Sequence, residues 1–161
     1  MTWLDLLTII LFVLVGFLEA KRGAVPAAVD LVLGLLGFNI AKTAAPMVGL
    51  GSEATSFVVL FVVAVGLTVL ASWLVDSFTK WDIGAYDSAV AGILGAISGL
   101  VLAHGAFHGA FVAGGHMASV AKGSMLVSEV HGLRTLHAIG NMLRNLGGGQ
   151  TITEKVREQQ K

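Results

Sequence analysis

The stretch 87–114, DSAVAGILGAISGLVLAHGAFHGAFVAG, decides the fold class. It is almost entirely apolar or small, and it exceeds the roughly 20 residues that a helix needs to cross the hydrocarbon core of a bilayer. Small side chains recur at every fourth position after Asp87, so they share one helix face. Such a face lets a neighbouring backbone come close. We therefore predict a membrane-spanning helix over 87–113 whose packing residues are Ala91, Gly95, Gly99 and Ala103.

The composition of the whole chain agrees with this prediction. Of 161 residues, 55% are hydrophobic and 12% are charged, whereas soluble domains carry roughly a quarter charged residues. Ten basic and ten acidic residues cancel, so no basic surface indicates a nucleic-acid partner. The chain has no cysteine, which excludes disulfides, thiolate metal sites and cysteine nucleophiles. The composition predicts an integral protein whose surroundings are a lipid bilayer.

Three further apolar runs lie before residue 87 in the sequence, at about 3–20, 26–48 and 56–78. Gly23 separates the first two, and the segment from Pro46 to Ser52 is expected to end the second. The run 56–78 is rich in β-branched residues, but a segment in lipid must satisfy its own backbone hydrogen bonds and so forms a helix. We predict an all-α, polytopic membrane protein with four transmembrane helices over residues 1–114.

The character of the chain changes after Gly114. Between 116 and 146 the apolar residues recur in steps of three and four, which is typical of an amphipathic helix. We expect a C-terminal amphipathic segment of one or two short helices that lie on the membrane or against the bundle. Residues 115–161 thus form this segment followed by a solvated tail.

Charge predicts the orientation in the membrane. Lys21, Arg22 and Lys80 belong to turns on one face, and most basic residues of the tail lie beyond the roughly 15–20 residues within which the positive-inside rule acts. The turns at 21–23 and 79–86 are therefore expected to be cytoplasmic. Four spans then place both termini outside the cytoplasm.

Short motifs along the chain support a family assignment by resemblance. A Trp-Leu-Asp start occupies 3–5, a basic-Arg-Gly turn occupies 21–23, and Asp87 is followed by Gly95 and Gly99. In this order and with four spans, the stretch from about 3 to 112 resembles the CvpA family, named for colicin V production. Family members often carry arginine where this chain has Ser88, glycine where it has Ala91, and a basic residue where it has Ser98.

The resemblance implies a multi-pass protein of the bacterial inner membrane. It implies a structural or interaction role linked to toxin production or export and to envelope homeostasis, without a cofactor, and with a protein partner or a second copy of the chain. In some actinobacteria a similar domain anchors an extracytoplasmic serine protease. That arrangement favours an extracytoplasmic C-terminus here as well.

Ionisable residues inside the spans are functional candidates by default, because a charge in hydrocarbon costs several kcal/mol. The candidates are Asp30, Lys42, Asp76 and Asp87. Asp30 and Asp76 lie within about two turns of the cytoplasmic face, where Lys21, Arg22 or Lys80 could pair with them. Lys42 is near the other end of its span and can extend to the headgroups. Asp87 is placed to cap its own helix.

His104 and His108 are four residues apart and therefore share a helix face. Three interpretations stay open: a metal site completed by His116, a proton-linked function near neutral pH, or hydrogen bonding to backbone or water. A zinc protease motif requires Glu after the first His, and position 105 is Gly. Two imidazoles also fall short of a zinc site, so no metal is assigned.

The sequence offers no enzymatic motif. Gly95-Ala-Ile-Ser-Gly99 does not fit the Gly-x-Ser-x-Gly nucleophile elbow, and the glycines lie in apolar helix rather than in a phosphate loop. We expect no enzyme. The alternative to the structural role is a small channel or proton-linked transporter, suggested by the intramembrane charges and the histidine pair, and a holin-like pore is a third possibility.

Overall fold

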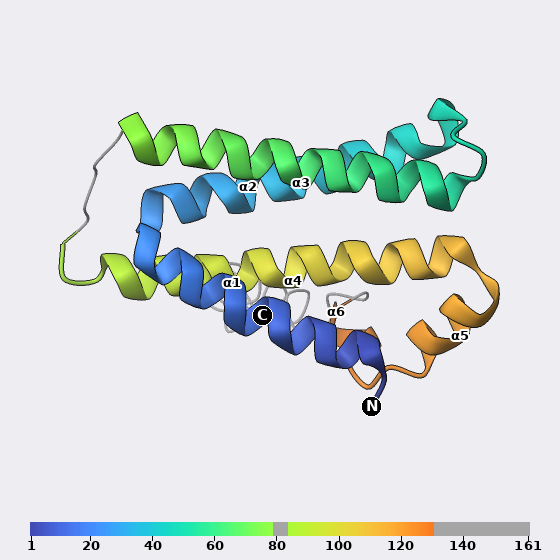
Figure 1. Ribbon diagram of the computed structural model, residues 1–161. Coiled ribbons are helices and arrows are strands. Elements are labelled where there is room, and N and C mark those ends of the chain that lie inside the picture. Colours follow the sequence, from blue (N-terminus) through green and yellow to red (C-terminus); the bar gives the residue numbers. More distant parts are fainter. Residues whose placement is uncertain (79–83, 131–161) are drawn as a thin grey trace, which may run out of the picture.

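The computed structural model describes residues 1–78 and 84–130, and these residues form helices without any strand (Figure 1). The helices are α1 Trp3–Arg22, α2 Ala24–Val48, α3 Glu53–Phe78, α4 Asp87–Ala113, α5 Gly115–Lys122 and α6 Val127–Val130. Within the described residues, α1 to α4 are the four helices that are long and apolar enough to cross a membrane. The predicted all-α class with four spans is confirmed, and the chain is a multi-pass membrane protein.

The four long helices form two pairs. α1 packs along α4 and α2 packs along α3, while α4 also lies against α2 and joins the pairs. At one end of the bundle lie the turn at Gly23, the end of α3 and the start of α4 (Figure 1). The N-terminus, the turn between α2 and α3, and α5 lie at the other end.

Glycines with positive φ mark the helix ends. Gly23, with φ of +104°, separates α1 from α2 within a single residue, a conformation that side chains other than hydrogen disfavour. The predicted end of the second span is confirmed, because α2 ends at Val48 and Gly49, whose φ is +64°, is its C-cap; Pro46 lies inside the last turn of the helix. The missing N–H of Pro46 removes one hydrogen bond, and two further helical residues still follow it.

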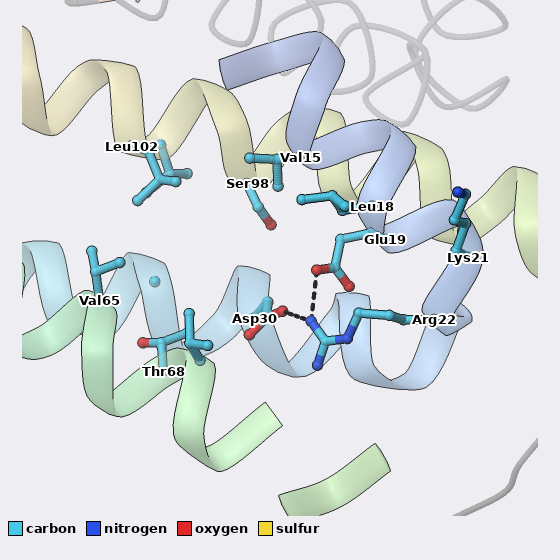
Figure 2. A pocket seen from close by; sticks show the side chains of 13 residues that line it. Val15, Leu18, Glu19, Lys21, Arg22, Asp30, Val65, Thr68, Ser98 and Leu102 are labelled. Atoms are coloured by element: carbon cyan, nitrogen blue, oxygen red, sulfur yellow. Dashed lines mark hydrogen bonds and ion pairs between the residues drawn. The ribbon is translucent and has the colours of Figure 1, made fainter. Parts of the chain in front are cut away.

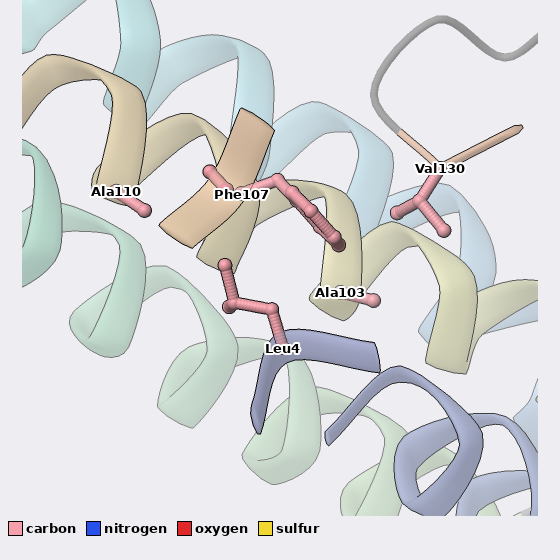
Figure 3. Close-up of a cluster of buried hydrophobic side chains, with 6 residues drawn as sticks. Leu4, Ala103, Phe107, Ala110 and Val130 are labelled. Atoms are coloured by element: carbon pink, nitrogen blue, oxygen red, sulfur yellow. The ribbon is translucent and has the colours of Figure 1, made fainter. Parts of the chain in front are cut away.

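The segment after α4 folds back on the bundle as the two short helices α5 and α6. Their buried apolar residues join a cluster formed by the start of α1 and the second half of α4 (Figure 3). The cluster consists of Leu4, Ala103, Phe107, Ala110, Ala121 and Val130. The expected amphipathic segment beyond residue 130, and Lys80, lie outside the described residues.

Asp5 holds this returning segment in place. Its side chain is 1% exposed and accepts hydrogen bonds from the N–H of Thr2 at 2.6 Å, from the N–H of Leu126 at 3.0 Å and from the hydroxyl of Ser124. A carboxylate accepts several such bonds at once. The acidic residue of the Trp-Leu-Asp start therefore connects α1 to the loop before α6.

We expect Asp5→Ala to release the returning segment, because it leaves buried donors unsatisfied at roughly 1–3 kcal/mol. The chain has no cysteine, so Val130→Cys, at a buried position, can report the release through maleimide labelling. The labelling rate should rise roughly tenfold with Asp5→Ala, since 1.4 kcal/mol corresponds to a factor of ten. Met125→Cys, at an exposed position, is the control and should label equally fast in both backgrounds.

Candidate functional site

Arg22, the last residue of α1, connects three helices (Figure 2). Its Nη1 donates to Glu19 Oε1 and to Asp30 Oδ2, each at 2.7 Å. Its Nη2 donates to the Ser72 hydroxyl at 2.6 Å, on α3. The planar guanidinium presents several donors in a fixed geometry, so it can serve partners on separate helices at once. Asp30 thus pairs with Arg22, one of the partners that the sequence suggested.

The ion pairs line a pocket of about 420 Å³ between the four helices. Apolar side chains make most of its wall, and the charged groups of Glu19, Arg22 and Asp30 lie together on one side of it (Figure 2). Thr68 and Ser98 add hydroxyls from α3 and α4. Lys21 also borders the pocket, but its ammonium lies over the Phe17 ring, 4.3 Å from the centroid.

The charges of this cluster do not balance. Two carboxylates, Glu19 and Asp30, face the single guanidinium of Arg22. Glu19 is 4% exposed, and both Glu19 Oε2 and Asp30 Oδ1 are buried without a hydrogen-bond partner among the described residues. Buried carboxylate oxygens normally have partners, so these two atoms identify the cluster as the candidate site.

Asp87 lies at the same end of the bundle, next to the start of α2. Its carboxylate accepts from the Ala24 N–H at 3.2 Å, and a Cβ built on Gly23 would lie 2.7 Å from its Oδ2. The expectation that Asp87 caps its own helix is wrong. Tyr86 is the N-cap of α4 and makes no side-chain cap bond, whereas Asp87 accepts from Ala24, whose N–H belongs to the first turn of α2 and has no partner within that helix.

The small-residue face of α4 lies against α1 of the same chain. A Cβ built on Gly95 would lie 2.6 Å from Glu19 Cβ, and one built on Gly99 would lie 2.5 Å from the Leu11 carbonyl oxygen. Ala91 and Ala103 are buried on the same face. The close approach also positions Glu19, because Gly95 has no side chain and the Cβ of Glu19 can lie directly against α4.

His104 and His108 pack among aromatic rings. His104 lies 4.7 Å from the Phe38 ring, and His108 lies 4.7 Å from the Phe57 ring, measured between centroids. His104 Nδ1 lies 2.8 Å from the Val130 carbonyl oxygen; because a carbonyl only accepts, the proton is on Nδ1. Among the described residues, no group of three His, Cys, Asp or Glu side chains could hold a metal. For His104 these contacts favour the interpretation of hydrogen bonding to backbone, and both histidine rings are packed against phenylalanines.

The other two intramembrane candidates stand apart from the Arg22 cluster. Lys42 is exposed on α2, and Asp76 is half-buried on α3. Asp76 pairs with neither Lys21 nor Arg22, and Lys80 is not among the described residues. The structure therefore does not bring Asp30, Lys42 and Asp76 to one cavity.

Sequence reasoning passed over Glu19 and considered Arg22 only as a turn residue that could pair with Asp30 or Asp76. A signal was present, because Glu19 falls inside the apolar run 3–20 and Arg22 follows at i+3 on the same helix face. An acidic residue inside a span and a basic residue one helical turn later can form an ion pair, and intramembrane ionisable residues almost always have such a partner. Comparison of the chain with protein-family models, with curated proteins and with solved structures finds no match.

Proposed function

We propose that the chain is a CvpA-like inner-membrane protein with a structural or interaction role in toxin production or export and in envelope homeostasis. The observation that supports the proposal is that residues of the CvpA-like motifs pack at contacts between helices. Gly23 of the basic-Arg-Gly turn abuts Asp87, and Gly95 and Gly99 abut α1. Motif residues far apart in the sequence thus serve one junction of α1, α2 and α4.

Complementation tests this role. The full chain is expressed in a bacterium that lacks its own CvpA-like protein, and colicin V secretion and detergent resistance are measured. The unmodified chain should restore both, and Gly99→Leu should not. Gly66→Leu is the matched control, since a Cβ built on Gly66 has nothing within 4 Å. A chain that inserts and folds without restoring either property contradicts the proposal.

The proposed orientation gives a separate prediction. Met47 lies near the α2–α3 turn and Tyr86 precedes α4 at the opposite end, and both are exposed. In intact cells a membrane-impermeant maleimide should label Met47→Cys and leave Tyr86→Cys unlabelled, with both labelled after permeabilisation. The reverse pattern would place both the turn between α2 and α3 and the N-terminus in the cytoplasm.

A second candidate function is a small channel or proton-linked transporter. The observation that favours it is the pocket bordered by Glu19, Arg22 and Asp30, since intramembrane ionisable groups often mark ion or proton pathways. Reconstituted vesicles with an internal pH reporter should then show flux that Asp30→Asn abolishes. Flux no greater than that of empty vesicles would exclude this function.

A further inference from the structure

The Arg22 cluster carries one negative charge more than its arginine neutralises when both carboxylates are ionised. Glu19 Oε1 and Asp30 Oδ2 bind the same nitrogen, Nη1 of Arg22, at 2.7 Å each. The two carboxyl groups therefore lie within two hydrogen-bond lengths of each other. At such separations in a low-dielectric environment, like charges repel strongly, and a carboxyl pair in one site commonly retains a proton.

The neighbouring hydroxyls do not relieve this excess. Thr68, Ser72 and Ser98 each donate their single proton to a backbone carbonyl oxygen. None of them is thus available as a donor to Glu19 Oε2 or Asp30 Oδ1, which have no partner in the part of the chain that the structure describes.

Among the described residues that border the pocket, no further cation balances the cluster. α1 contributes Glu19, Lys21 and Arg22, and α2 contributes Asp30, while the pocket residues of α3 and α4 carry no charge. The Lys21 ammonium lies over the Phe17 ring rather than on either carboxylate. The charge that remains needs a proton or a bound cation from solution.

We propose that the Glu19–Asp30 pair is a proton-binding site that holds one proton at neutral pH. The proton gives one carboxyl an O–H donor and leaves a single carboxylate to balance Arg22. A proton satisfies the pair better than a metal ion does, because the described residues provide no third acidic or histidine ligand. Both carboxyl groups of the site line the pocket between the four helices.

Infrared difference spectroscopy on the full chain in phosphatidylethanolamine–phosphatidylglycerol vesicles tests the site. At neutral pH the unmodified protein should show the carbonyl stretch of a protonated carboxylic acid, and the band should shift in D₂O. Glu19→Gln and Asp30→Asn should each lose it, because the remaining carboxylate is then ionised beside Arg22. Asp76→Asn, which alters a carboxyl outside the pocket, is the control and should keep it.

Two results would overturn the site. Absence of the band in the unmodified protein would do so without any variant, and so would a band that persists in either Glu19→Gln or Asp30→Asn. A band that is lost when NaCl is raised at constant pH would assign the site to a metal cation instead.

The proton site shares its residues with the second candidate function but does not depend on transport. A band without flux supports the site and excludes the transporter. Flux without a band contradicts the site and leaves the transporter standing.

Discussion

Gly99→Ala is expected to destabilise the bundle, although alanine is the better helix former by about 1 kcal/mol. A Cβ at position 99 would lie 2.5 Å from the Leu11 carbonyl oxygen and 3.0 Å from Phe12 Cα. Both are backbone atoms of α1, so the helix itself must move. Overpacking of this kind typically costs about 1–3 kcal/mol, which exceeds the gain in propensity. Gly99→Leu should prevent α1 from docking altogether.

Thermal unfolding in detergent, followed by size-exclusion chromatography, measures the effect. Gly66→Ala is the matched control, because it makes the same chemical change in a helix with open space around the added atom. It should unfold at the same temperature as the unmodified chain or slightly higher. If Gly99→Ala is as stable as Gly66→Ala, the α1–α4 contact is not as close as described.

Arg22→Met is expected to give the second large effect. It leaves Glu19 and Asp30 buried without a counter-charge, and removal of one partner from a buried ion pair costs roughly 3–5 kcal/mol. It also removes the hydrogen bond to Ser72, so α1, α2 and α3 lose their common contact. Arg22→Lys should be intermediate, because a lysine lacks the planar set of donors. The unfolding temperature of each variant in detergent measures the loss.

Lys21→Met is the control for charge at the same turn. Its cation–π contact with Phe17 is worth about 0.5–1 kcal/mol at an exposed site, so its effect should be much smaller. Combining Arg22→Met with Glu19→Gln should recover part of the stability, since one buried charge is removed. Equal effects of Arg22→Met and Lys21→Met would show that the cluster contributes little.

The four long helices could be predicted because the hydropathy and length of a segment determine whether it can cross a lipid bilayer. Any apolar run long enough to span lipid must form a helix to satisfy its backbone. The helix ends were harder, because they depend on single residues. The predicted end of α2 at residue 48 is confirmed, but Pro46 lies inside the helix, and Gly49 in a left-handed conformation ends it.

The partners of polar residues could be predicted only in part. Asp30 was expected to pair with Lys21, Arg22 or Lys80, and it pairs with Arg22. Asp87 was assigned to its own helix, yet it accepts from Ala24, far earlier in the sequence. Local spacing identifies a carboxylate that needs a donor, but the donor comes from whichever helix packs nearest.

By itself the sequence determined that the protein is an all-helical membrane protein and that one face of 87–113 consists of small residues. Those properties follow from composition and periodicity, which are local. Only the tertiary structure decided that this face meets α1, that Asp5 holds the returning segment, and that Glu19, Arg22, Asp30 and Ser72 form one cluster. The physical reason is that a buried charge is tolerated only where partners converge, and here they converge from three helices.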